Sequence, residues 1–176
     1  MIEFTNALVN YAFNEIGVRE ETKNSGVRIA EYQSATALGP GPYPWCAAFT
    51  AWCLRQTLSD KAVVDSLVKN KILNSVSAVE SWRCKSARAF DWEPWAKKNK
   101  LLVIPNAASL AKRGDFVVYD FSHIGIVALD QLTTERVITA IEGNTNIRGS
   151  RNGDGVYAKT RRVDPSVIAC YIRMPV

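Results

Sequence analysis

PWCAAFTAWC, residues 44–53, places a cysteine where a loop must end and an apolar run begins. The stretch before it, LGPGPYP (38–44), holds two glycines and three prolines, which exclude regular structure there. From Cys46 onward, Phe49 and Cys53 repeat at helical spacing within a broadly apolar segment. We therefore expect a buried helix that begins at Cys46.

The start of a helix is a favourable place for a nucleophilic cysteine. A thiol attacks only as the thiolate, and the unpaired N–H groups and dipole of a helix N-terminus stabilise that anion. Cys46 is expected in this setting, whereas Cys53 lies two turns further on and is interpreted as a small core residue.

The C-terminal third changes from helical to strand patterns. Short runs rich in β-branched and aromatic residues alternate with turn residues, which predicts a mostly antiparallel, five-stranded sheet. These runs are GDFVVYD (114–120), HIGIVALD (123–130), RVITAIEGN (136–144), GVYAKTRRV (155–163) and SVIACYIRM (166–174).

The first half of the chain favours helices. Residues 4–17 place Val9, Ala12, Phe13 and Ile16 on one stripe before Gly17, and 27–33 is a shorter helical candidate. Residues 60–100 indicate a helical, tryptophan-rich insertion. Helices followed by strands predict an α+β fold, in which a single domain (1–176) packs its N-terminal helices on the sheet.

The later strands offer partners for a thiolate. His123, the only histidine, opens a predicted strand after a tight turn, which suits a general base at a cleft rim. Glu142 and Asn144 end the next strand, and residues two apart share a strand face. Either side chain would orient the imidazole; we favour Glu142, because an anion stabilises imidazolium more strongly.

Each of these residues also has a structural interpretation. Free cysteines are usually buried core residues, a single histidine is usually structural, and Glu-Gly-Asn is common in turns. The order of the motifs favours the functional interpretation: a cysteine at a helix start, a histidine at a strand start, then Glu-x-Asn at the next strand end.

These motifs resemble the papain-like CHAP and NlpC/P60 superfamily of peptidoglycan hydrolases. The resemblance spans nearly the whole chain and is weakest over 60–100; its matching stretches are IGVREE (16–21), PWCAAFTAWCL (44–54), RGDFVVYDFSHIGIV (113–127) and ITAIEGNTN (138–146). CHAP-like members match best because they carry a Glu-x-Asn pair.

The resemblance implies a papain-like fold, with Cys46 as nucleophile, His123 as general base and then acid, and Glu142 or Asn144 as the orienting group. It implies cleavage of peptidoglycan amide bonds, by a stem-peptide endopeptidase or an N-acetylmuramoyl-L-alanine amidase.

The sequence departs from the papain-like pattern at the oxyanion donor. Papain-like enzymes often use a glutamine shortly before the nucleophile, but the only upstream glutamine here, Gln33, lies thirteen residues before Cys46. The backbone N–H of Cys46 and a second donor would then take that role.

Two other classes of function stay open. The same fold would serve a cysteine protease or deamidase toxin that acts on a protein substrate, and purified peptidoglycan would then be left intact. A catalytically silent binding module would instead keep Cys46 as a core residue, alkylated no faster than an ordinary exposed thiol.

Composition narrows the partners. The net charge of +5 comes from scattered cations, with KTRR (159–162) the one short run, so nucleic acid is not an expected partner. One histidine and four dispersed cysteines predict neither a metal site nor a cofactor, and pairing of Cys84 with Cys170 stays open. No apolar run is long enough for membrane insertion.

The N-terminus lacks the pattern of a secretory leader, so we expect synthesis in the cytoplasm. Action on a cell wall then requires release by phage lysis or export as an antibacterial effector. In the second case, a cognate immunity protein would be a partner.

Overall fold

A six-stranded sheet with every neighbouring pair antiparallel forms the centre of the computed structural model, which describes residues 2–106, 109–134, 136–164 and 166–174. The spatial order is β1-β6-β2-β3-β4-β5. The strands are β1 (Leu102–Val103), β2 (Phe116–Tyr119), β3 (His123–Val127), β4 (Val137–Thr145), β5 (Gly155–Arg162) and β6 (Ile168–Ile172).

The α+β class and the antiparallel sheet are confirmed, but the count of five strands is wrong. The five predicted runs form β2 to β6, and the additional strand, β1, pairs with β6 at the sheet edge. Two residues are too few to show the alternation by which a strand is recognised in a sequence.

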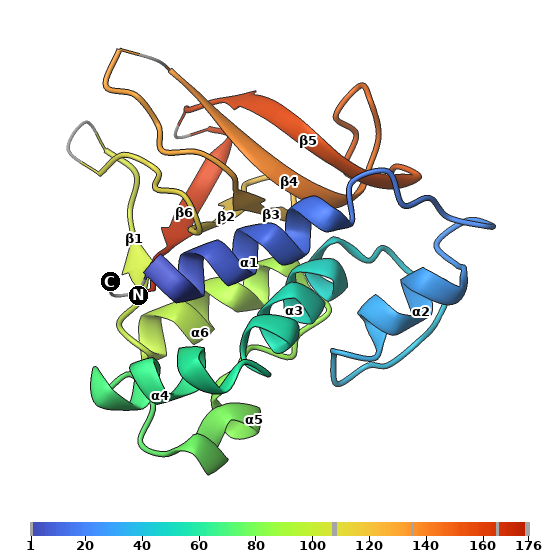
Figure 1. The fold of residues 1–176 in the computed structure, drawn as a ribbon. Helices are drawn as coiled ribbons and strands as arrows, with labels where there is room; N and C mark the ends of the chain where they lie inside the picture. The colour runs from blue at the N-terminus through green and yellow to red at the C-terminus, as the bar shows by residue number, and fades with distance from the viewer. Residues whose placement is uncertain (1, 107–108, 135, 165, 175–176) are drawn as a thin grey trace.

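The helices lie mainly below the sheet in the view of Figure 1, with α1 and α3 against one of its faces. The α-helices of the described residues are α1 (Ile2–Asn14), α2 (Val27–Gln33), α3 (Cys46–Thr57), α4 (Lys61–Lys69), α5 (Val79–Trp82) and α6 (Trp92–Lys98), with short 3-10 turns at Val76–Ala78 and Ala89–Asp91. Residues 60–100 are therefore largely helical, as expected.

The stripe predicted on α1 is partly wrong. Val9 and Ala12 are buried, but Phe13 is 65% exposed and Ile16, beyond the helix end, is 38% exposed. Phe4 and Leu8 instead complete the buried face with Val9 and Ala12. The helix ends at Asn14, before Gly17, whose φ of 100° turns the chain away from the helical path.

Alternating residues of the sheet belong to two apolar cores. Phe116 and Val118 pack in the large core shared with α1 and α3, whereas Val117 and Tyr119 belong to a smaller core on the other face. Trp45 and Trp92 are fully buried in the large core and act as packing residues.

The start of α3 rests directly on the end of β4. A side chain at Gly143 would collide with Phe49 and Trp45, since its Cβ would lie 2.6 Å from Phe49 Cβ and 2.8 Å from the Trp45 ring. Glycine therefore permits the close approach that brings the first turn of α3 to the strand carrying Glu142 and Asn144.

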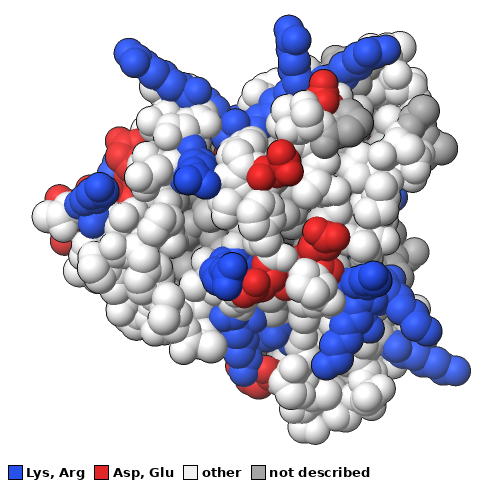
Figure 2. All heavy atoms as spheres, turned by 180° about the vertical axis from the view of Figure 1, so that it is seen from behind, with Lys and Arg blue, Asp and Glu red and all other residues white. Residues whose placement is uncertain are grey.

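Charged groups are dispersed over the surface. On the face shown in Figure 2, lysines and arginines occur in several groups with aspartates and glutamates between them. The described residues contain neither a helix long and apolar enough to cross a membrane nor a cluster of three or more histidine, cysteine, aspartate or glutamate residues suited to a metal ion.

Candidate active site

Cys46 is the first residue of α3, as the loop before it predicts. Trp45 occupies the N-cap position, and its side chain makes no capping hydrogen bond. The first-turn N–H groups of Cys46 and Ala47 have no carbonyl available within the helix. Cys46, a residue that is 6% exposed, thus lies beside backbone donors able to stabilise an anion.

His123 begins β3 after the three-residue turn that follows Tyr119. Its ring is fully buried and stacks on Tyr119 and Phe121, with centroids 5.9 Å apart in both pairs. Nε2 lies 2.9 Å from Oε2 of Glu142. These contacts fix the ring plane and leave Nδ1 as the nitrogen available to a second group.

The Cys46 thiol influences the same ring. Nδ1 is buried and forms no hydrogen bond with a described residue, and the Cys46 thiol acts electrostatically on the imidazole. Burial opposes a charge on the ring, but Cys46 and then Glu142 outweigh it and raise the pKa of His123 to about 9. This electrostatic balance favours the imidazolium form of His123 at neutral pH.

Glu142 is fully buried and held by three side chains. Arg161 donates through Nε to Oε1 at 2.7 Å and through a terminal nitrogen to Oε2 at 2.6 Å, and the Tyr119 hydroxyl donates to Oε1 at 2.9 Å. Burial favours the neutral acid, but Arg161 and His123 outweigh it and lower the pKa of Glu142. The carboxylate facing His123 is therefore ionised.

Gly125 gives that carboxylate its space. A Cβ at this position would lie 2.8 Å from Cγ of Glu142, so a larger residue on β3 would displace the glutamate.

Burial raises the pKa of Tyr119 well above its ordinary value, and the Glu142 charge adds to the effect. Tyr119 therefore stays protonated and remains a donor.

Asn144 lies elsewhere, so the prediction that it shares a face with Glu142 is wrong. The register of β4 shifts between Glu142 and Thr145, and Asn144 has a left-handed φ of 54°. Its Oδ1 accepts from the backbone N–H of Trp45 at 3.3 Å. Its Nδ2 donates to Glu20, Asn24 and the Gly153 carbonyl at 3.0–3.2 Å.

Asn144 therefore positions the start of α3 rather than the imidazole. Glu20 supports the same segment, because its Oε1 also accepts from the Trp45 indole at 2.7 Å. Of the four predicted site residues, the structure brings Cys46, His123 and Glu142 together and places Asn144 behind the nucleophile.

Sequence reasoning missed Arg161 and Tyr119. Arg161 lies in the KTRR run, which reads as solvated charge, but its side chain is largely buried against Glu142. One signal in the sequence could have indicated Arg161: a buried glutamate needs a cation as a partner.

Gln33 holds the loop before Cys46. Its side-chain amide donates a hydrogen bond to the Gly41 carbonyl and accepts one from the Gly41 N–H.

The remaining three thiols are protonated core groups. Cys53, Cys84 and Cys170 are free and buried, and burial raises the pKa of each thiol, to about 11 for Cys84 and about 12 for Cys170. All three are therefore protonated at neutral pH and suited to packing. Cys84 and Cys170 are not joined by a disulfide.

A pocket of about 280 Å³ lies over the candidate nucleophile. We call it the Cys46 pocket; its lining is Leu38, Tyr43 and Pro44 from the loop before α3, residues 87–90 from the helical insertion, Ser122 and Cys46 itself. The thiol thus has access to a space large enough for a small group of a substrate.

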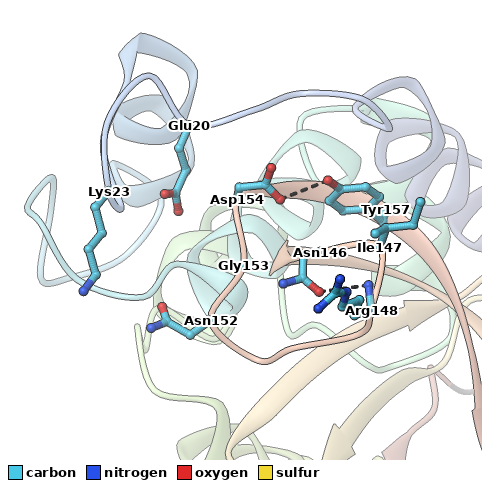
Figure 3. A pocket seen from close by; sticks show the side chains of 9 residues that line it. All are labelled: Glu20, Lys23, Asn146, Ile147, Arg148, Asn152, Gly153, Asp154 and Tyr157. Carbon is cyan, nitrogen blue, oxygen red and sulfur yellow. Dashed lines mark hydrogen bonds between the residues drawn. The ribbon is translucent and has the colours of Figure 1, made fainter.

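A second, polar pocket of about 490 Å³ lies between the loop after α1 and the β4–β5 turn. Figure 3 shows Glu20 and Lys23 on one side, with Asn152, Gly153 and Asp154 on the other. Its lining includes neither a thiol nor an imidazole. The Glu20 carboxylate in its lining also accepts a hydrogen bond from Trp45. This pocket therefore adjoins the hydrogen bonds by which Asn144 and Glu20 hold the start of α3.

Comparison of the chain with protein-family models, with curated proteins and with solved structures gives no match. The chemistry of the site is therefore derived from its own residues.

Proposed function

We propose that this protein is a cysteine amidohydrolase with a papain-like arrangement of helix and sheet. One observation carries the proposal: the buried His123 is held by Glu142 at Nε2, its Nδ1 has no hydrogen-bond partner among the described residues, and the Cys46 thiol acts on the same ring. Covalent amide hydrolysis requires a nucleophile, a base and a group that orients the base, and Cys46, His123 and Glu142 would fill these three roles.

The first step is acylation. The Cys46 thiolate attacks the carbonyl carbon of the substrate, and the first-turn N–H groups of α3 stabilise the oxyanion that forms. The His123 imidazolium then gives its proton to the leaving amine as the C–N bond breaks. The products of this step are a free amine and an acyl-thioester on Cys46.

The second step is hydrolysis of that thioester. Neutral His123 takes a proton from water as its oxygen attacks the thioester carbonyl. The C–S bond then breaks, which restores the Cys46 thiolate and releases the acyl group as a carboxylic acid. Glu142 stays ionised throughout, because Arg161 and Tyr119 hold it, and it keeps the imidazole in one orientation.

The substrate class rests on the resemblance of the motifs to peptidoglycan hydrolases. We propose bacterial peptidoglycan as the substrate, cleaved in the stem peptide or at its junction with N-acetylmuramic acid. A phage lysis enzyme and an exported antibacterial effector are the two settings in which such an enzyme would act.

The test is mass spectrometry of fragments released from purified peptidoglycan by the wild type and by Cys46→Ala. Cys53→Ala is the matched control, since it removes a thiol from the same helix without touching the site. We expect fragments from the wild type and from Cys53→Ala, none from Cys46→Ala, and almost none from His123→Ala, because no second histidine can take over.

Each alternative has its own signature. Rapid, selective alkylation of Cys46 without wall fragments would point to a protein substrate. Fragments that persist in Cys46→Ala would exclude a cysteine hydrolase, and Cys46 alkylation no faster than that of the buried thiols would favour a binding module.

A further inference from the structure

The Cys46 pocket has walls of small and apolar side chains with a single charged one. Two large apolar residues of the lining are exposed, Leu38 by 65% and Phe90 by 41%. Ala87 and Ala89, also in the lining, have small side chains that take up little of the pocket. Arg88 is the one charged residue of the lining. Exposed apolar groups around a concave site are typical of a surface that a ligand covers.

The Arg88 side chain has no partner among the residues that the structure describes. The Arg88 guanidinium forms neither a hydrogen bond nor an ion pair with a described residue; only the Arg88 backbone N–H is hydrogen-bonded. Arg83, five residues earlier, is by contrast bound by Glu80 and the Ala35 carbonyl. A free guanidinium offers paired N–H donors that match a carboxylate.

The backbone that carries Arg88 is nevertheless fixed. The Ser86 hydroxyl accepts from the Arg88 N–H at 3.0 Å and donates to the Asp91 carboxylate at 2.6 Å. The two walls are also joined, because the Ala37 N–H donates to the Lys85 carbonyl at 2.8 Å. The pocket is thus formed before a ligand arrives, which lowers the entropic cost of binding.

We propose that the Cys46 pocket is a substrate subsite that binds a small apolar group next to a free carboxylate, with Arg88 holding the carboxylate. The helical insertion of residues 60–100 thereby supplies the specificity-determining wall of the site. The hydrolase reaction needs only Cys46, His123 and Glu142, whereas Arg88 selects which amide reaches them.

The first test uses two small alkylating agents and does not depend on the proposed function. Iodoacetate and iodoacetamide both transfer a two-carbon group to a thiolate with loss of iodide, but only iodoacetate carries a carboxylate. The rate of Cys46 labelling by each agent is followed by mass spectrometry of the Cys46 peptide. The ratio of the two rates reports the attraction of the pocket for a carboxylate, and His123 contributes equally in every variant.

Arg88→Ala should lower the ratio of iodoacetate to iodoacetamide rates by about fivefold or more, since a nearby positive charge is lost. Arg88→Lys should keep most of the ratio. Arg162→Ala is the matched control: it removes an exposed arginine at the C-terminal end of β5 that does not line the Cys46 pocket, so the ratio should stay unchanged. An unchanged ratio in Arg88→Ala, or an equal fall in Arg162→Ala, would overturn the subsite.

The second test rests on the proposed function. A peptidoglycan stem peptide with free carboxylates is compared with the same peptide in which each is a carboxamide. The wild type should hydrolyse the free form at least fivefold faster, and Arg88→Ala should remove that preference by slowing the free form alone. Equal wild-type rates would reject the subsite and leave the hydrolase intact; if neither peptide is cleaved, the proposed function fails and the alkylation ratio alone decides the subsite.

Discussion

Glu142 and Asn144 lie two residues apart on β4, yet they belong to separate hydrogen-bond networks. The Glu142 network, formed with Tyr119, His123 and Arg161, orients the imidazole and favours its charged form. The Asn144 network, formed with Glu20, Asn24, Gly153 and the Trp45 backbone, sets the position of the helix start. A shift of register between them lets one strand serve both purposes.

Among the variants that compare the two networks, the largest effect should come from Glu142→Gln. A neutral amide stabilises imidazolium less than a carboxylate does, and its N–H₂ group would face the Arg161 and Tyr119 donors. We therefore expect turnover to fall by about 10²- to 10⁴-fold. The variant should also be less stable, by about 3–5 kcal/mol, because the largely buried Arg161 loses its counter-charge. Turnover and denaturant unfolding measured on the same preparation give both values.

A double variant separates these two consequences. Glu142→Gln with Arg161→Met removes both buried charges, which should recover much of the stability while turnover stays low. Recovery of turnover together with stability would mean that Glu142 acts only through folding and has no effect on the imidazole.

The next effect is on the protonation of His123. NMR titration of the chain's only imidazole should give a midpoint near pH 9, and turnover should fall above that pH as the imidazolium is lost. Because the folded pKa is raised from 6.5, the stabilisation is fully present below about pH 6.5 and disappears as the pH rises through about 9. Cys46→Ala removes the largest favourable interaction, so its midpoint should be lower. A wild-type midpoint near 6.5 would refute the charged imidazole at neutral pH.

A smaller effect on turnover, with a clear effect on stability, is expected for Asn144→Ala. The change leaves buried donors and acceptors unpaired and forces alanine into a left-handed conformation, which together cost about 2–4 kcal/mol. Turnover of the folded fraction should fall less than tenfold, as measured below the unfolding transition.

Asn144→Gly is the matched control, because glycine adopts the same φ without strain. The difference between the two variants gives the cost of the backbone conformation, and the remainder that of the hydrogen bonds. If the His123 midpoint shifted in Asn144→Ala as it does in Glu142→Gln, the separation of the two networks would be refuted.

The parts of the site predicted from sequence depend on local rules. The Pro- and Gly-rich loop defines the start of α3, so Cys46 could be placed before the structure was known. The short turn after Tyr119 likewise placed His123 at the start of β3. The choice of Glu142 over Asn144 as imidazole partner followed from charge alone, and it agrees with the 2.9 Å contact.

What could not be predicted depends on register and on distant packing. The alternation rule assigns Asn144 to the face of Glu142, and only the shifted register removes it. Arg161 is opposite Ile138 in the sheet, four residues from the glutamate it reaches, so its role requires the pairing of β4 with β5. Arg88 lies in the insertion, whose position over Cys46 no local pattern indicates.

The smallest effect should come from Tyr119→Phe, which tests how redundant the Glu142 network is. The change removes one donor to the carboxylate, while the bidentate Arg161 and His123 remain. A hydrogen bond to a charged acceptor is worth about 1.5–3 kcal/mol, and we expect the lower end because the remaining donors keep Glu142 ionised. Turnover should fall only a few-fold, with the ring stacking on His123 retained. A loss as large as that of Glu142→Gln would show that Tyr119, rather than Arg161, holds the carboxylate toward the imidazole.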